Sequence, residues 1–286
     1  MGKPTVSVLT ATWNRAHLIG AAIESVRDQT FPDWELIVVD DGSTDTTAGV
    51  IRGWQAKDKR IAYFRMPTRE SIAAVSNLGL AHAQGKYVAI LDDDDWWIDK
   101  RKLEKQVAFM DAHPDCVACG GGIMMVDERG KELGRALKKE SDAEIRNVAL
   151  FANPMANSTT LFRADAASAV GRYDDTTIRQ FADWDFWLKL GLRGKFYNFP
   201  EYFAAYRIHP GSSSFQKQRE NADAAIIIVK RYRRKYPGFW KGILYAYGYR
   251  IYTFAPLWFR RGTYAFLSSV KKRLFARALI GDGLEK

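Results

Sequence analysis

Four consecutive aspartates, Asp92–Asp95, directly follow the apolar run Tyr87–Leu91. Adjacent carboxylates repel one another, so this segment requires a cation or several hydrogen-bond donors to offset its charge. A hard divalent ion, Mg²⁺ or Mn²⁺, is the simplest partner, because proteins hold such ions with one or two carboxylates plus substrate phosphates. The alternative is an acidic surface loop that is only solvated. The neighbouring indoles of Trp96 and Trp97 argue against it, because two adjacent tryptophans are seldom both exposed.

Polar residues also follow two other strand-like runs. Val6–Thr10 leads into Ala11–Arg15, and Leu36–Val39 leads into Asp40–Asp45. Taken singly, residues of the second loop also have structural explanations, because its glycine can form a turn and its serine or threonine can cap a following helix.

The elements that must position these residues alternate between strand and helix patterns. The strand-like runs, with a further one at Ile61–Phe64, are apolar and rich in β-branched or aromatic residues. Segments of helical length lie between them, at Ala16–Val26, Asp45–Gln55 and Ser71–Ala83. This alternation predicts βαβ units and a Rossmann-like, mostly parallel sheet flanked by helices. Ligands bind at the carboxyl ends of such strands, so the polar residues are expected along one edge of the sheet.

Length and composition restrict the class of protein. The 286 residues are 47% hydrophobic, which is enough for a substantial core and excludes a disordered chain. Two cysteines exclude a disulfide-dense scaffold, and Cys116 and Cys119 lie in an apolar run where buried, reduced thiols are expected. No signal-peptide pattern follows Met1 and no stretch of about 18 clean apolar residues occurs, so a cytoplasmic protein without a transmembrane span is expected.

The net charge of +10 is unevenly distributed along the chain. Residues 216–286 hold 16 of the 43 Lys and Arg and 4 of the 33 Asp and Glu, a local charge of +12, whereas residues 1–215 carry −2. We therefore predict an α/β domain at 1–215 and a basic, aromatic-rich, amphipathic helical extension at 216–286.

The extension has two open interpretations. Within Phe266–Leu279, apolar residues recur at helical spacing and are segregated from three cations. Such a segment suits an anionic membrane surface, which would place the protein peripherally on the inner face of the cell membrane. The alternative is a helical cap whose aromatic side chains pack on the domain. No nucleic-acid partner is expected, because no nucleic-acid-binding module accompanies the charge.

Six blocks of the sequence occur in an informative order: Val6–Asn14, Ser25–Phe31, Glu35–Asp45, Gly85–Asp95, Phe181–Trp187 and Tyr206–Ser214. Together they resemble the family 2 glycosyltransferases, which have the GT-A fold, over roughly residues 4–215. The fourth block resembles the strand that ends in the Asp-x-Asp motif of this family. The resemblance implies a nucleoside diphosphate sugar as donor and a divalent metal, Mn²⁺ or Mg²⁺, as cofactor.

The resemblance also implies roles for individual residues. Asp183 falls where the family places its catalytic base, although it could instead cap a helix. Asp92, Asp94 and His209 would hold the metal, although His209 could instead be an exposed loop residue. The residues expected to contact the nucleotide sugar are Ala11, Thr12, Asn14, Asp40, Asp41, Asn77, Asp92 and Asp93, with Asp40 and Asp41 at the base and Asp93 near the ribose.

These residue types are consistent with sugar transfer. A divalent cation neutralises the departing diphosphate as a Lewis acid, and a carboxylate removes the proton of the attacking hydroxyl. A single base opposite the leaving group implies one displacement with inversion, unlike the two-carboxylate arrangement of glycosidases. We expect a UDP-sugar donor and a glycan or lipid-linked acceptor, in cell-surface polysaccharide or lipopolysaccharide synthesis.

The sequence departs from the family pattern at two positions. Ala182 stands where a glutamate commonly precedes the base, and Asp185 is the residue that could replace it. Ser76 stands where an arginine is frequent, so Arg65 or Arg69 would have to supply a cation to the donor.

Two other functions compete with this interpretation. A phosphohydrolase with an aspartate nucleophile would need a second carboxylate two residues later, where Asp40 is followed by Gly42 and Asp41 by Ser43. A non-catalytic sugar-nucleotide-binding or membrane-associated scaffold protein is favoured by the missing acid at Ala182.

Overall fold

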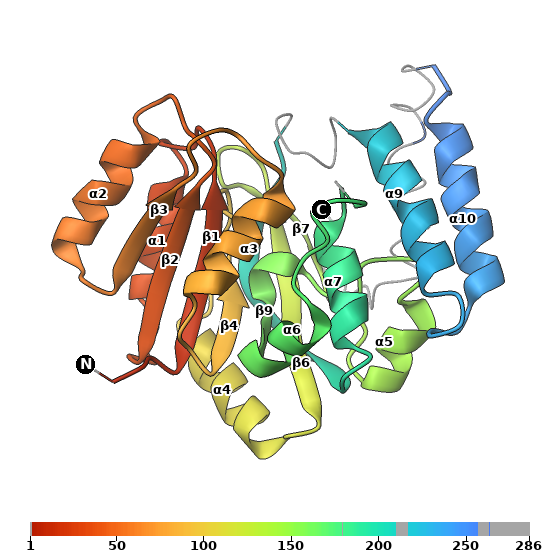
Figure 1. The fold of residues 1–286 in the computed structure, drawn as a ribbon, viewed down its shortest axis with the longest axis horizontal. Coiled ribbons are helices and arrows are strands. Elements are labelled where there is room, and N and C mark those ends of the chain that lie inside the picture. Colours follow the sequence, from red (N-terminus) through yellow and green to blue (C-terminus); the bar gives the residue numbers. More distant parts are fainter. Residues whose placement is uncertain (1, 179, 210–216, 257–262, 264–286) are drawn as a thin grey trace, which may run out of the picture.

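The structure, a computed structural model, describes residues 2–178, 180–209, 217–256 and 263. This described part of the chain forms one nine-stranded sheet with helices on both faces and a pair of helices at one end (Figure 1). The strands are β1 (Val6–Thr12), β2 (Trp34–Asp40), β3 (Ile61–Arg65), β4 (Tyr87–Ile90), β5 (Trp96–Trp97), β6 (Cys116–Val126), β7 (Glu132–Ala136), β8 (Leu161–Arg163) and β9 (Lys195–Arg207). The helices are α1 (Ile19–Arg27), α2 (Thr47–Lys57), α3 (Ile72–His82), α4 (Lys102–Ala112), α5 (Asp142–Val148), the 3₁₀ helix η1 (Asn157–Thr159), α6 (Ala164–Val170), α7 (Ala182–Leu190), α9 (Gln218–Arg231) and α10 (Phe239–Tyr252).

The N-terminal half of the sheet is parallel, as predicted. Its strand order is β3-β2-β1-β4, with α1, α2 and α3 as the connecting helices. The register pairs Thr12 with Asp40 and Asp40 with Arg65, so three strands end at one level. The loops that follow β1, β2 and β4 therefore meet at one edge of the sheet, which is the upper edge in Figure 1.

The C-terminal half of the sheet is mixed. Strand β8 is antiparallel to both β4 and β6, whereas β6 and β9 are parallel. The short strand β5 is antiparallel to the end of β9, with Trp96 opposite Ala205. This pairing has a consequence for chemistry, because the acidic run Asp92–Asp95 precedes β5 and the segment after β9 contains His209. The two segments therefore lie side by side.

Two hydrophobic clusters cover the two faces of the sheet. One lies between the sheet and α1, α2 and α4, and the other lies between the sheet and α3, α6 and α7. Successive residues of β1 contribute to opposite clusters, Val8 to the first and Leu9 to the second, as expected for a strand buried on both faces. Cys116 and Cys119 are buried free thiols in β6, which confirms the prediction for them.

Helices α9 and α10, which belong to the predicted extension 216–286, pack beside α7 through a third cluster. Ile228 and Tyr232 of α9 are buried in it with Leu188 of α7. An ion pair reinforces this contact, because the fully buried Asp185 of α7 accepts a hydrogen bond of 2.9 Å from Arg231. The first part of the extension thus packs on the domain.

The predicted amphipathic segment Phe266–Leu279 lies outside the described residues. Within the residues that the structure describes, no helix has the length and apolar character needed to cross a membrane.

Candidate active site

The acidic run after β4 is held in a turn by hydrogen bonds from other elements. Asp92 accepts a hydrogen bond of 2.8 Å from the Asn157 amide, and Asp95 accepts one of 2.5 Å from the Ser158 hydroxyl. The second oxygen of Asp95 accepts from the backbone N–H of Arg207 at 2.9 Å. The two outer carboxylates are therefore anchored to η1 and β9, whereas the inner pair, Asp93 and Asp94, lies beside Arg15 and His209.

Asp94 and His209 form the closest contact between the predicted metal-binding residues. Oδ2 of Asp94 lies 2.9 Å from Nε2 of His209, and the two side chains are 19% and 9% exposed. Arg207 braces this pair, because its Nε donates to the backbone carbonyl of Asp94 at 3.1 Å. The structure thus brings together two residues that the sequence assigned to the same cation.

The acidic turn carries more negative charge than its surroundings neutralise. Burial and the neighbouring Asp94 raise the pKa of Asp92 to about 7 and that of Asp93 to about 7. Burial and the same neighbour raise the pKa of Asp95 well above its usual range. Arg15, 3.8 Å from Asp93, is a partly compensating cation. An additional cation at this position would relieve the repulsion.

The donor set at this turn fits a hard divalent ion. Among the described residues, no group of three or more His, Cys, Asp or Glu side chains is arranged to enclose a metal. Mg²⁺ and Mn²⁺ do not require such an enclosure, since one or two protein ligands suffice when a diphosphate and water supply the rest. Asp94 and His209 provide an oxygen and a nitrogen at a mutual distance suited to two ligands of one ion, and Asp92 lies in the same turn.

The two aspartates after β2 have different environments. Asp40 is fully buried, and its oxygens accept hydrogen bonds from the Ser43 N–H at 2.7 Å and the Tyr63 hydroxyl at 2.6 Å. It thereby fixes the turn. Gly42 in this turn has a left-handed φ of 72°, as expected for a glycine that forms a turn. Asp41 is 9% exposed and accepts one hydrogen bond of 2.7 Å from the Glu70 N–H. Burial raises the pKa of Asp41, and Glu70 N–H and Arg69 oppose this effect.

The residues after β1 join the first loop to the second. Asn14 has a left-handed φ of 53°, and its side chain accepts a hydrogen bond of 2.8 Å from the Thr44 N–H. The backbone N–H of Asn14 donates to the Ser43 hydroxyl, so Ser43 and Thr44 support the loop and do not cap α2, which begins at Thr47. Thr12 is buried and its carbonyl accepts from the Asp41 N–H at 2.8 Å. Ala11 is partly buried at the end of β1.

Arg69 and Trp13 mark the outer rim of this region. The Arg69 guanidinium lies 3.5 Å from the centre of the Trp13 ring, and that indole is 37% exposed. Arg69 is also close enough to lower the pKa of Asp41. Arg65, the other candidate cation, donates to the Ser43 carbonyl at 2.7 Å and braces the turn.

Asn77 is engaged by the backbone of a distant segment. Its amide oxygen accepts from the Tyr173 N–H at 2.9 Å, and its amide nitrogen donates to the Tyr173 carbonyl at 3.1 Å. This two-point contact fastens α3 to the chain that leads into α7. Both polar atoms of the Asn77 amide are engaged by this backbone, and the contact of Asn77 with the donor stays a prediction.

Asp183 lies in the first turn of α7 but does not cap it. The capping position belongs to Phe181, which has a left-handed φ of 55°. Oδ2 of Asp183 accepts a short hydrogen bond from the Asn153 amide, and burial raises the pKa of Asp183. The negative charge of Asp183 also helps to raise the pKa of Asp92. The predicted base and the predicted metal turn therefore lie close enough for their charges to interact.

Asp185 does not replace the acid that is missing at position 182. It points toward α9, where Arg231 and Tyr232 donate to it at 2.9 and 3.0 Å, and Lys189 lies 3.0 Å from its other oxygen. The side chain that contacts Asp183 is the amide of Asn153. No local pattern around Asn153 marked it in the sequence, and the same holds for Asn157 and Ser158.

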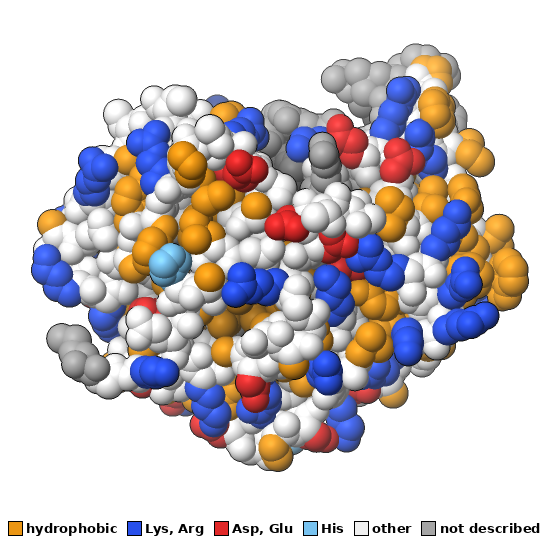
Figure 2. Space-filling view, viewed as in Figure 1, with side chains coloured by type: hydrophobic (Ala, Val, Ile, Leu, Met, Phe, Trp, Pro, Cys, Tyr) orange, Lys and Arg blue, Asp and Glu red, His pale blue; other side chains and the backbone are white. Residues whose placement is uncertain are grey.

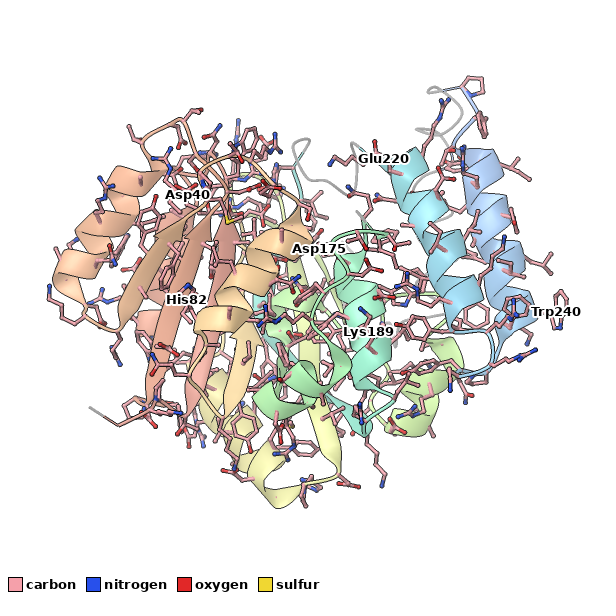
Figure 3. The ribbon with its side chains drawn as sticks, viewed as in Figure 1. Asp40, His82, Asp175, Lys189, Glu220 and Trp240 are labelled. Atoms are coloured by element: carbon pink, nitrogen blue, oxygen red, sulfur yellow. The ribbon has the colours of Figure 1, made fainter. Side chains whose placement is uncertain are left out.

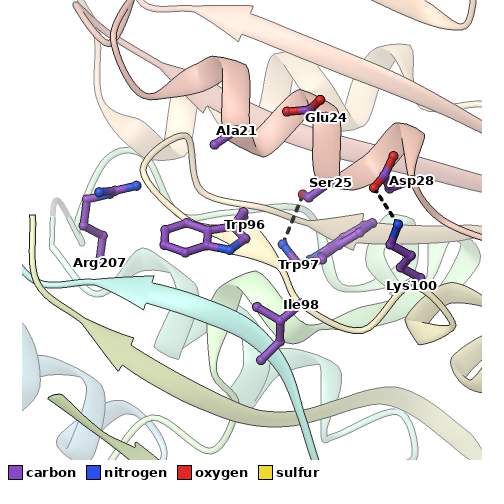
Figure 4. A pocket seen from close by; sticks show the side chains of 9 residues that line it. All are labelled: Ala21, Glu24, Ser25, Asp28, Trp96, Trp97, Ile98, Lys100 and Arg207. Atoms are coloured by element: carbon purple, nitrogen blue, oxygen red, sulfur yellow. Dashed lines mark hydrogen bonds and ion pairs between the residues drawn. The ribbon is translucent and has the colours of Figure 1, made fainter. Parts of the chain in front are cut away.

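A cavity of about 300 Å³ lies between α1 and the β5 region, as Figure 4 shows. Its lining contains none of the predicted site residues and consists of Ala21, Glu24, Ser25, Asp28, Trp96, Trp97, Ile98, Lys100 and Arg207. Arg207 connects the two regions, because the same side chain contacts Asp94 and lies 4.9 Å from the centre of the Trp96 ring.

The fold of the chain is that of the GT-A glycosyltransferases. TarS of S. aureus in complex with UDP-GlcNAc superposes with a TM-score of 0.67 at 18% identity, over 94% of this chain and 77% of TarS 1–349. The mannosyltransferase PcManGT of Pyrobaculum calidifontis, in complex with GDP-Man and Mn²⁺, gives 0.63 at 21% identity, over 94% of this chain and 75% of that one.

The sequence comparisons place the chain in a family. The model of Glycosyl transferase family 2 matches residues 7–171, and the chain belongs to this family. The putative glycosyltransferase EpsE of Bacillus subtilis is 33% identical over 81% of this chain and 83% of its own length. The putative teichuronic acid biosynthesis glycosyltransferase TuaG of the same organism is 32% identical over 75% and 83%. WfgD of Escherichia coli, a UDP-Glc:alpha-D-GlcNAc-diphosphoundecaprenol beta-1,3-glucosyltransferase, is 38% identical over a shorter stretch, 37% and 40%.

The protein is therefore a glycosyltransferase, as the resemblance implied, and not a phosphohydrolase.

Proposed function

We propose that the protein transfers a sugar from a UDP-sugar to a glycan or lipid-linked acceptor, with inversion and with the help of a divalent cation, in cell-surface polysaccharide or lipopolysaccharide synthesis. The names of two relatives support the pathway and the donor, since TuaG is assigned to teichuronic acid biosynthesis and WfgD to transfer from UDP-Glc to a diphosphoundecaprenol-linked sugar. The observation that carries the proposal is the contact of 2.9 Å between Asp94 of the acidic turn and His209. The charge of Asp183 also acts on this turn, because it helps to raise the pKa of Asp92.

Asp94 and His209 are the residues proposed to hold Mn²⁺ or Mg²⁺, with Asp92 in support. A bound divalent cation would supply Lewis-acid stabilisation for the charge that develops on the departing diphosphate. The chain's own contribution is to hold the turn that carries Asp92 and Asp94 in place, through hydrogen bonds from Arg207, Asn157 and Ser158.

Asp183 is proposed to accept the proton of the acceptor hydroxyl. Its pKa is raised by burial, which makes its carboxylate a stronger base than a solvated one. The Asn153 amide holds one oxygen of this carboxylate in place. A single base of this kind supports direct displacement with inversion.

Asp41 is proposed to recognise the base of the donor, with Ala11 and Thr12 in the same pair of loops and with the fully buried Asp40 holding the turn. Arg69 and the exposed face of Trp13 border that position and offer a cation and a stacking surface.

The extension 216–286 is proposed to hold the enzyme peripherally at the inner face of the cell membrane. Its local charge of +12 and its aromatic residues support this location, which would bring the active site to a lipid-linked acceptor.

The test of the transfer reaction is release of UDP from a panel of UDP-sugars in the presence of Mn²⁺, Mg²⁺ or EDTA with candidate acceptors. We expect release that needs metal and that is lost in Asp183→Asn, whereas UDP still binds to this variant. UDP release at the full rate in EDTA would refute the role of the metal. Full turnover by Asp183→Asn would refute the assignment of Asp183 as the base. Asp165→Asn is a matched control, because Asp165 is an acidic residue in the first turn of α6 that no proposed step uses.

A further inference from the structure

Helix α10 exposes a continuous apolar stripe on the side that faces away from the domain. The stripe consists of residues spaced alternately by four and three positions, and their exposed fractions are 75% for Trp240, 72% for Leu244, 44% for Tyr247, 71% for Ile251 and 60% for Phe254. Phe254 continues the stripe just beyond the end of the helix at Tyr252. In Figure 2 these hydrophobic side chains gather at the right edge of the molecule, and Figure 3 shows Trp240 at that outer edge. An apolar surface of this extent generally marks a contact with a partner.

The stripe is not part of the core of the molecule. The opposite face of α10 already packs on the domain, since Ile243 and Ala246 are buried in the third cluster. Gly242 comes so close to Leu150 that a β-carbon there would lie 2.7 Å from the Leu150 carbonyl oxygen. The helix is thus fixed in orientation by one face and presents the other outward.

Cations surround the stripe. Residues 217–256 contain nine Lys and Arg but only two acids, Glu220 and Asp223. Lys230 lies 5.4 Å from the centre of the Tyr247 ring, and Arg219 and Arg250 lie 4.8 and 4.7 Å from that of Phe254. A further group of exposed cations lies between α9 and α10 and at the start of α10: Arg233, Arg234, Lys235 and Lys241.

We infer that this stripe and its cations dock on an anionic lipid surface. The inference rests on the membrane location in the proposed function and adds the element that makes the contact. An apolar stripe bordered by basic residues matches the boundary between acyl chains and anionic headgroups.

Charge favours an anionic lipid surface over the two other partners that could cover the stripe, which are a second copy of the chain and residues 257–286. A second copy of the chain that bound through the same face would place one cationic face against another. Residues 257–286 contain seven Lys and Arg against two acids, so they too carry the same sign as the surface. An anionic partner is the one that neutralises the face, because like charges brought together cost free energy.

The experiment is co-sedimentation of the full chain with vesicles of phosphatidylglycerol and phosphatidylcholine, and with vesicles of phosphatidylcholine alone. We expect binding to the first and little to the second. Leu244→Ser/Ile251→Ser should reduce the partition coefficient at least about tenfold. Arg233→Gln/Arg234→Gln/Lys235→Gln should reduce it roughly 100-fold.

Matched controls lie elsewhere on the surface. Leu133→Ser/Leu192→Ser removes two leucines that are 55% and 47% exposed, and it should leave the partition coefficient unchanged. Arg52→Gln/Lys57→Gln/Lys59→Gln removes three exposed cations on and beside α2, and it should have a much smaller effect than the triple variant of the extension.

Three results would overturn the inference. Unchanged vesicle binding by Leu244→Ser/Ile251→Ser would assign the contact to residues outside the stripe, such as 257–286. An equal decrease of the partition coefficient in Leu133→Ser/Leu192→Ser would show that vesicle binding does not depend specifically on the stripe. Self-association without lipid that the same double variant abolishes, measured by sedimentation velocity, would identify a second copy as the occupant.

The same variants are also tested for UDP binding by thermal shift with Mn²⁺, which should be unchanged. If the wild-type chain binds vesicles as expected but binds no UDP, the proposed function fails and the docking surface stands. If it binds UDP but no vesicles, the docking surface fails and the transfer reaction stands.

Discussion

Nε2 of His209 and Oδ2 of Asp94 lie 2.9 Å apart although they are 115 positions apart in the sequence. The short strand β5 makes this possible, because its pairing with the end of β9 sets the acidic turn beside the segment after β9. Each side chain is at least four-fifths buried, so their contact excludes most of the solvent.

Replacement of His209 by alanine should lower turnover roughly 100- to 1,000-fold, because several kcal/mol of charge stabilisation depend on the cation. The effect should be partly overcome by a higher Mn²⁺ concentration. Initial rates across a metal titration measure this, with His113→Ala as the control, since His113 is an exposed histidine after α4. A rate for His209→Ala that equals the wild-type rate at low Mn²⁺ would remove His209 from the metal site.

Asn153→Ala should shift the acidic limb of the pH profile of kcat/KM to higher pH. The reason is that the Asn153 hydrogen bond lowers the pKa of Asp183 against the larger effect of burial. Without that hydrogen bond the pKa of Asp183 rises, so the base is protonated at a higher pH and activity is lost earlier on acidification. A decrease in rate with an unmoved limb would show that Asn153 acts only on structure.

Trp13→Ala should weaken UDP binding roughly tenfold or more, because stacking of a base on an aromatic side chain contributes about 1–3 kcal/mol. The indole is exposed, so the fold should be little affected. Isothermal titration with UDP measures the change, and Trp240→Ala serves as a control far from the nucleotide loops. Equal affinity of Trp13→Ala and the wild type would place the base elsewhere.

Lys102→Met should stabilise the protein at neutral pH. Lys102 is fully buried, donates a hydrogen bond of 2.7 Å to Gln106 and lies 4.1 Å from the centre of the Trp97 ring. Burial lowers its pKa to about 7 from 10.5. Above pH 10.5 the Lys102 amine is neutral in both the folded and the unfolded protein. As the pH falls toward 7, the unfolded chain takes up a proton that the buried amine of the folded chain does not. The free energy of unfolding therefore decreases by at most about 1.4 kcal/mol per pH unit.

Urea unfolding at pH 7 and at pH 10 tests this sign. The gain in the free energy of unfolding from Lys102→Met should be larger at pH 7 than at pH 10, since burial of the Lys102 amine destabilises the wild type fully only at the lower pH. A gain that does not depend on pH would mean that the Lys102 amine is solvated or paired in the folded protein.

Arg231→Met should destabilise the protein by about 2 kcal/mol, because it removes a partner of the fully buried Asp185 carboxylate. The decrease in the free energy of unfolding should be smaller than for a fully buried ion pair, since the Arg231 side chain is 30% exposed and Lys189 and Tyr232 remain in contact with Asp185. The midpoint of urea unfolding measures it. Arg233→Met, at an exposed position nearby, should change the midpoint little.

The sequence predicted the parallel strands and the edge that carries the acidic residues, because alternating strand and helix patterns encode both. It also predicted the Asp94 and His209 pair, through resemblance to a family. It did not predict the β5 and β9 pairing, since a two-residue strand such as Trp96–Trp97 has no periodicity to detect. Register between distant strands depends on tertiary packing, which a local pattern does not contain.

The polar partners of the site residues were also beyond prediction. Asn153 contacts Asp183 across 30 positions, and nothing in its local sequence distinguishes it from a surface asparagine. The same limit explains Asn77, whose amide binds the backbone of Tyr173 across 96 positions. A side chain's type predicts what it can bind, but only the fold determines which partner reaches it.

The most direct test of the cation site is the affinity for UDP with and without Mn²⁺, measured by isothermal titration on the wild type and on Asp94→Asn. The proposed site predicts that Mn²⁺ tightens UDP binding to the wild type at least about tenfold and has little effect on Asp94→Asn, because Asp94 and the diphosphate would both be ligands of the same metal ion. Equal UDP affinity of the wild type in Mn²⁺ and in EDTA, or undiminished tightening in Asp94→Asn, would contradict it.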